Sequence, residues 1–235
     1  MVRKKPDWRI EQPRDEMSPL SPATSTPRWG VFLCGGIIVL VGIMAFYNSF
    51  GGVFVFDDNK VIKENPSIRQ LWPPQKVISA EPGTTSHGRP VLAYSLAINY
   101  AISGLETWSY HAVNLAIHLL GALTLFGLAR RTLLTDPLRE RFGKASLLLS
   151  LGVAMIWTVH PLQTMSVTYI VQRAEAIVGL FYLLCLYCAV RGASSPRPRW
   201  WYSASVVACA LGMASKEVMV TAPVIVLLYD RTFLG

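Results

Sequence analysis

Long apolar runs dominate this chain and leave few folds open to it. The first run, residues 31–50, contains no charged side chain and is long enough to cross the ~30 Å hydrocarbon core of a bilayer. It is too long for the apolar core of a signal peptide, and no small-residue cleavage pattern follows it. Only 15% of the residues are charged, against about a quarter in a soluble domain. We therefore expect an all-α, polytopic membrane protein.

The charges predict a topology rather than a nucleic-acid partner. The formal net charge is +8, but the basic residues lie at the edges of the apolar runs and form no single stripe. Basic connections stay in the cytoplasm, which places the N-terminus there. Residues 1–28 are polar and rich in proline, so we expect a disordered cytoplasmic tail followed by a transmembrane domain over 29–235. Nucleic acid is excluded as a partner on this reasoning.

Further apolar segments follow the first one. The final apolar stretch is interrupted at Ser215-Lys216-Glu217, and we favour two short helices that turn there over one long helix with a buried charge pair. A short amphipathic segment, residues 90–105, is expected to lie at the membrane interface within a first outer loop over 51–108. The expected total is about six transmembrane helices, the later ones within residues 110–128, 145–159, 167–190 and 200–229.

Asp57 and Asp58 form an acidic pair directly after the first predicted span, in a chain with few acids. Their height relative to the bilayer is fixed by that span. A carboxylate there could deprotonate an attacking hydroxyl, or it could coordinate a divalent cation such as Mg²⁺ or Mn²⁺ together with a second acid. The alternative is a solvated turn or a helix cap, for which aspartate is equally suited. We take both residues as candidate catalytic residues.

Gln172, Arg173 and Glu175 lie inside or at the mouth of the predicted span 167–190. Ionisable residues within a membrane usually face a cavity or pair with one another. Arg173 is the candidate for binding the phosphate of a lipid-linked donor, because a guanidinium binds phosphate oxygens in a bidentate manner. The alternative is a structural pair with Glu175, which positions two apart on a helix do not favour.

Lys216 and Glu217 lie on the same side of the membrane in this topology and could extend the anion site. An exposed turn between short helices explains them equally well. His160 precedes Pro161 and either ends a helix or faces substrate, and Arg89 precedes the amphipathic segment. Together with Gln172 and Arg173, these four residues make up the candidate substrate-binding set.

Histidine and cysteine patterns indicate packing rather than metal chemistry. His111, Asn114 and His118 share one helix face, where hydrogen bonds between helices are favoured over metal ligation. The four cysteines all lie within apolar runs, as small packing residues do. No glycine-rich phosphate loop, Ser-His-Asp pattern or zinc spacing is present in the sequence.

The order of these motifs resembles a known family. An acidic pair after the first span is followed by GRPVLAYSLAINYAISGL, WSYHAVNLAIHLL, HPLQTMSVTYIVQR and SKE…LLYD. This series resembles the membrane portion of the GT-C glycosyltransferases, above all the transmembrane and tetratricopeptide-repeat O-mannosyltransferase-like group and its bacterial relatives. The resemblance covers roughly residues 31–233.

The resemblance implies a membrane enzyme that transfers a sugar from a polyprenyl- or dolichyl-phosphate donor to an extracytoplasmic acceptor, a protein or a glycan. It implies an acid of the first loop at the active site, which matches Asp57 or Asp58, and places basic motif positions at Arg173 and Lys216. The membrane would be a bacterial inner membrane or else the endoplasmic reticulum. Such relatives continue through more helices and a repeat domain, so we expect an incomplete GT-C domain here. A flippase or transporter for a lipid-linked substrate, or a non-catalytic membrane fragment, is the alternative function.

Overall fold

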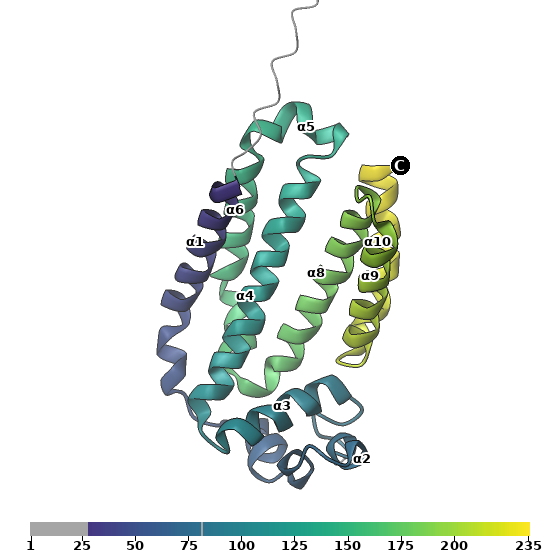
Figure 1. Ribbon diagram of the computed structural model, residues 1–235. Coiled ribbons are helices and arrows are strands. Elements are labelled where there is room, and N and C mark those ends of the chain that lie inside the picture. Colours follow the sequence, from purple (N-terminus) through teal and green to yellow (C-terminus); the bar gives the residue numbers. More distant parts are fainter. Residues whose placement is uncertain (1–27, 81) are drawn as a thin grey trace, which may run out of the picture.

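The computed structural model describes residues 28–80 and 82–235, and every regular element in this part of the chain is a helix (Figure 1). The all-α prediction is therefore confirmed for the described residues. The predicted tail, residues 1–28, lies outside them except for Arg28, which is the first residue of a helix. Its disorder stays a prediction.

Within residues 28–80 and 82–235, three helices are long and apolar enough to cross a membrane. The first is α1 (Arg28–Phe46), continued by the 3₁₀ turn η1 (Tyr47–Gly51). The second is α4 (Thr107–Thr132), and the third is α8 (Arg173–Ala193), preceded by η6 (Ile170–Gln172). These three agree with the spans that hydropathy predicts at the corresponding places.

A fourth apolar segment is bent. After α5 (Asp136–Phe142) and η4 (Gly143–Ala145) comes α6 (Ser146–Thr158), followed by η5 (Pro161–Gln163) and α7 (Thr164–Thr168). The segment Leu138–Thr158 meets the segment Pro161–Thr168 at an angle of 53°. Pro161 has no N–H to continue a helical ladder, and the residue before a proline avoids helical geometry, which explains the break. Counted as one span, this pair raises the number of candidate spans in the described residues to four, rather than about six.

The C-terminal apolar stretch folds as two helices, as the SKE interruption predicts. α9 (Pro198–Met213) ends just before it, and η7 (Glu217–Thr221) and α10 (Ala222–Tyr229) follow, with the π-helical turn η8 (Asp230–Leu234) after them. α9 and α10 lie side by side in Figure 1 with their connection at one end. Neither helix reaches the length of the three long ones.

The segment between α1 and α4 forms a cap over one end of the bundle (Figure 1). It contains η2 (Asn59–Lys63), η3 (Pro66–Arg69), α2 (Pro74–Ile78) and α3 (Pro90–Ser103). The predicted helix 90–105 is thus present, with Leu92 and Leu96 fully buried against the cap and the start of α8.

The bundle has two sides joined by the contact of α4 with α8. α1, α4 and α6 share one apolar core, and α8, α9 and α10 share another. Helices α8 and α9 approach closely, because a Cβ atom on Gly192 would come within 2.7 Å of the Tyr202 ring. Helix α3 of the cap contacts both α4 and α8, so the cap lies where the two sides of the bundle meet (Figure 1).

Candidate active site

Asp58 is buried and fastens the cap to the bundle. One carboxylate oxygen accepts the N–H of Val55 at 3.1 Å, and the other accepts the N–H of Val171, in η6, at 2.8 Å. Burial raises the pKa of the Asp58 carboxyl above its usual value, against the lowering effect of these two hydrogen bonds and of nearby His111. Both of its oxygens are thus engaged by backbone on either side of the junction, which is a positioning role.

Asp57, its neighbour, is exposed. Its backbone N–H donates to the hydroxyl of Tyr169 at 3.2 Å, and the preceding Phe56 packs edge-on against the same tyrosine ring. Phe56 has a positive φ of 44°, a tight backbone geometry that turns the chain just before the acidic pair. Within the described part of the chain, the Asp57 carboxylate makes no hydrogen bond or ion pair. Of the two predicted catalytic residues, only Asp57 is accessible to a substrate.

Arg173 does not face a cavity, which corrects its predicted contact with a donor phosphate. The side chain is fully buried at the start of α8. Its Nε donates to Asn114 Oδ1 at 2.6 Å and its Nη2 to Asn99 Oδ1 at 2.7 Å. Two backbone carbonyls, those of Ser95 and Tyr110, accept further N–H groups at 3.1 Å each. Four hydrogen bonds in a closed interior leave no face of the guanidinium for a ligand.

These hydrogen bonds hold three helices together. Asn99 belongs to α3, Asn114 to α4 and Arg173 to α8. Asn114 also donates to the carbonyl of Ile170 at 3.3 Å, in the turn that Asp58 binds from the other side. A buried cation needs hydrogen-bond acceptors, and here two asparagine side chains and two backbone carbonyls supply them without a carboxylate.

Arg89, Lys216 and Glu217 lie where the start of α3 meets the turn between α9 and η7, and their role in binding a substrate stays a prediction. Arg89 pairs with Glu217 at 3.6 Å. Lys216 pairs with Glu175 of α8, not with its sequence neighbour, and the two side chains are 28% and 41% exposed. The alternative of an Arg173–Glu175 pair is therefore not realised in the described residues, as expected for positions two apart on a helix.

A groove of about 380 Å³ lies beside this ion pair, walled by α4, α6, α7, α8 and η7. Glu175 is its charged residue, and Tyr182, in the same wall, contacts the Thr221 hydroxyl at 3.0 Å. Aromatic and aliphatic side chains make up much of the remaining wall. The residues that line the groove include His118, Trp157, Gln163, Ser166, Leu183 and Val218. Such a mixed groove suits a substrate with both polar and apolar parts.

The remaining predicted substrate residues lie apart from Asp57. His160 is exposed, and its Nδ1 accepts the N–H of Leu162 at 3.2 Å, as a cap of the 3₁₀ turn. Gln172 is half-buried in η6, and its backbone N–H donates to Tyr169. Both residues lie near the bend at Pro161, and neither side chain forms a hydrogen bond with Asp57 or Asp58 in the described structure.

On the polar face of α4, Asn114 and His118 form hydrogen bonds to other segments, as predicted, while neither ring nitrogen of buried His111 has a hydrogen-bond partner among the described residues. His118 contacts the carbonyl of Thr158 in α6 at 2.9 Å and stacks on Trp157. A cation does not fit the acidic pair, because Asp58 turns into the interior while Asp57 faces solvent. The described residues contain no group of three or more histidine, cysteine, aspartate or glutamate side chains placed to hold a metal ion.

Asn99 and Tyr169 are residues of this region that the sequence did not place in the site. Asn99 was a polar position in an apolar helix, which is the usual signal of a buried hydrogen bond. Tyr169 carried no local signal, because its partner Asp57 lies 112 positions away in sequence.

Residues 86–233 match the family model described as dolichyl-phosphate-mannose-protein mannosyltransferase. The chain is 30% identical over 203 residues to the protein O-mannosyl-transferase tmtc2 of Xenopus laevis, and equally to the human protein O-mannosyl-transferase TMTC2. Each alignment covers 81% of this chain and 23% of the relative. It is also 29% identical over 239 residues to human TMTC4, covering 89% of this chain and 30% of that protein.

The chain thus spans about a quarter of the length of the first two of these relatives. No solved structure matches it.

Proposed function

The chain belongs to the dolichyl-phosphate-mannose-protein mannosyltransferase family, and from this membership and its site we propose that it takes part in transferring mannose from a dolichyl-phosphate donor to a protein hydroxyl. The observation that carries the proposal is the acidic pair. Both carboxylate oxygens of Asp58 accept hydrogen bonds that anchor the cap, while the side chain of Asp57, on the same turn, is exposed.

In the proposed reaction Asp57 is the general base. Its carboxylate takes the proton of the acceptor hydroxyl as the hydroxyl oxygen attacks the anomeric carbon of the sugar. The bond between that carbon and the donor phosphate oxygen breaks, and dolichyl phosphate leaves with the electron pair. The only charge to be neutralised on the leaving side is that of the departing phosphate.

Lys216 and Arg89 are the basic side chains that we propose for that phosphate. Lys216 faces Glu175, Arg89 faces Glu217, and both basic side chains are partly exposed. A phosphate would exchange these partners and gain charge-assisted hydrogen bonds. The neighbouring groove, with its apolar wall, is the proposed position of the isoprenoid or sugar portion of the donor.

The proposed topology places α1 with its N-terminus in the cytoplasm and the cap on the extracytoplasmic side. α9 and the η7–α10 pair complete six spans as short, paired helices. α3 is proposed to lie in the interface, because Ile98 and Ile102 are exposed on its outer face and Trp108 follows at the start of α4. Labelling of single cysteines, introduced in the cap or in α5, with a reagent added on the outer side tests this arrangement. We expect a cysteine in the cap to be labelled and one in α5 to remain unlabelled.

The transfer assay uses the full chain in proteoliposomes with radiolabelled dolichyl-phosphate mannose and a serine/threonine-containing acceptor protein. We expect label on the acceptor with the wild type and its loss with Asp57→Asn. Glu64→Gln, on another exposed acid of the cap, is the matched control and keeps transfer. Adding a chelator to the same assay tests the divalent-cation expectation.

A flippase is the rival function, and the same proteoliposomes distinguish it. Movement of the labelled lipid between leaflets with no label on the acceptor would contradict the proposed transfer. Transfer that persists in Asp57→Asn would contradict the role of this carboxylate while leaving the family membership untouched.

A further inference from the structure

A second cavity, of about 580 Å³, lies at the end of the bundle opposite the cap. It is formed where α4 ends, α5 begins and the last turns of α8 and of the C-terminal helix come together. Its volume falls within the range of small-ligand sites. Neither the family match nor the proposed reaction assigns it a role.

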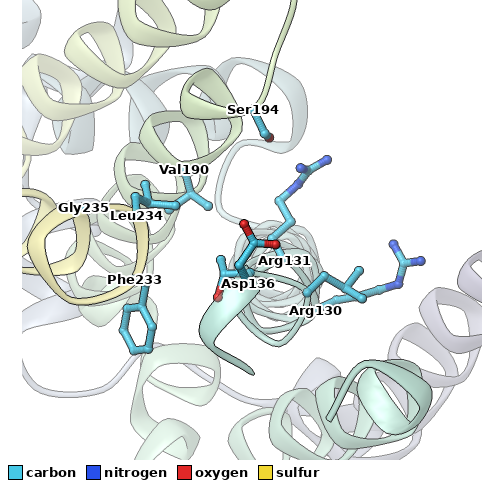
Figure 2. A pocket seen from close by; sticks show the side chains of 10 residues that line it. Arg130, Arg131, Asp136, Val190, Ser194, Phe233, Leu234 and Gly235 are labelled. Carbon is cyan, nitrogen blue, oxygen red and sulfur yellow. The ribbon is translucent and has the colours of Figure 1, made fainter. Parts of the chain in front are cut away.

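The lining combines both signs of charge with an apolar wall. In the view of Figure 2, Asp136 lies between the two arginines, Arg130 and Arg131, and the apolar side chains of Val190 and Leu234. Ser194 closes one edge near the Arg131 side chain. A ligand that uses all of these features carries an anion, a cation and an apolar part within one small molecule.

Arg131 is held in place by aromatic packing. Its guanidinium lies 5.6 Å from the centroid of the Tyr187 ring, and that ring packs edge-on against Trp201 of α9. Cation–π contact of this kind fixes a long side chain without consuming its five N–H donors. An arginine so oriented is prepared to bind a phosphate through two of them.

In the proposed topology, on which this inference rests, the cavity lies at the depth of lipid headgroups. α1 begins beside exposed Trp29, and α9 begins with exposed Trp200 and partly exposed Trp201, at the same end of the bundle. Tryptophans of this kind gather at membrane–water interfaces, where basic residues join them. A phospholipid would reach the cavity from the adjoining leaflet with its acyl chains still in the bilayer.

We propose that this cavity binds the headgroup of an aminophospholipid, of which phosphatidylethanolamine is the simplest. The phosphodiester is bound by Arg131, the primary ammonium by Asp136, and the glycerol backbone lies against Val190 and Leu234. Asp136 selects the amine, because it repels a purely anionic headgroup and the trimethylated ammonium of phosphatidylcholine has no N–H to donate to it.

The test measures lipid retention by native mass spectrometry of the full chain, exposed to equal amounts of phosphatidylethanolamine, phosphatidylglycerol and phosphatidylcholine. We expect phosphatidylethanolamine to be retained roughly tenfold over the other two, the effect of one hydrogen bond to a charged group. Asp136→Asn removes that preference while retention of phosphatidylglycerol rises. Arg131→Gln lowers the retention of all three lipids, and Arg131→Lys restores part of it.

Arg139→Gln is the matched control, since it removes an exposed cation from α5 at the same end of the molecule. Retention equal to the wild type is expected. A wild type without preference among the three lipids, or an Asp136→Asn variant that keeps the preference, overturns the proposal. A control variant that loses as much lipid as Arg131→Gln also overturns it, because binding would then follow total charge.

Discussion

Two charged regions flank the junction between cap and bundle, and they use similar residues in opposite ways. The inner junction, consisting of Asp58, Asn99, Asn114 and Arg173, is buried and each member is hydrogen-bonded. The outer rim, consisting of Asp57, Arg89, Glu175, Lys216 and Glu217, is partly or fully exposed and its pairs are simple ion pairs.

The difference shows that burial, rather than residue type, decides which charge is structural. A buried charge is costly unless its hydrogen-bonding groups are satisfied, so the inner junction cannot release a member to a ligand. An exposed pair is worth little in stability and exchanges partners readily. The inner junction therefore holds the fold of the site together, and the outer rim is the region for which we propose chemistry.

Replacing Arg173 breaks the inner junction and has the largest expected effect on stability. Arg173→Gln leaves at least two of the four buried acceptors without a donor, which costs about 3 kcal/mol or more. We expect a large fall in melting temperature in detergent or loss of folded protein. Arg89→Gln, at the outer rim, is the control and changes melting little. Equal melting of both variants would remove the distinction between the regions.

Asn114→Ala tests a single contact of the inner junction. The change removes the acceptor of Arg173 Nε and the donor to Ile170, so we expect a loss of about 1–3 kcal/mol in the free energy of unfolding. Urea or thermal unfolding of the purified protein measures it. Thr124→Ala, further along α4 and exposed, is the control. An Asn114→Ala variant as stable as the control would show that α4 and α8 do not depend on this contact.

Lys216→Gln separates function from stability at the outer rim. Its ion pair with Glu175 is partly exposed, so its removal costs less than about 1 kcal/mol of stability. If Lys216 binds the departing phosphate, transfer falls roughly tenfold, as expected for one charge-assisted hydrogen bond. Initial rates at several donor concentrations measure this. Unfolding on the scale of Arg173→Gln would instead assign Lys216 to the inner junction.

The pH dependence of Asp58 gives the smallest effect. The pKa of its carboxyl is raised in the folded protein, so the folded state holds the proton to higher pH than the unfolded state does. This contribution to stability is present below the ordinary pKa and is lost as pH rises through the raised value. The melting temperature of the wild type minus that of Asp58→Asn should therefore fall as pH rises from about 4. A difference that grows with pH contradicts the raised pKa.

Hydropathy and proline placement were sufficient to predict much of the bundle. The runs that became α1, α4 and α8 are long and nearly free of charge, and the SKE interruption marked the turn after α9 correctly. The bend at Pro161 shortens the fourth segment, and hydropathy alone does not determine its angle.

Partner choice within the site was not predictable in the same way. Arg173 was expected to face a phosphate, yet its acceptors Asn99 and Asn114 are 74 and 59 positions away. Asp57 and Asp58 are indistinguishable by position, and only the geometry of the turn sends one carboxylate inward. Contacts between distant segments decide these outcomes, and a local pattern does not contain them.

The most direct test of the central claim compares Asp57→Asn with Asp58→Asn in the mannose transfer assay, with the rate divided by the amount of folded protein. The account predicts that Asp57→Asn lowers this rate by about 100-fold or more at an unchanged melting temperature. Asp58→Asn is expected to lower the melting temperature while the rate per folded molecule falls far less. A folded but inactive Asp58→Asn beside an active Asp57→Asn would contradict the account.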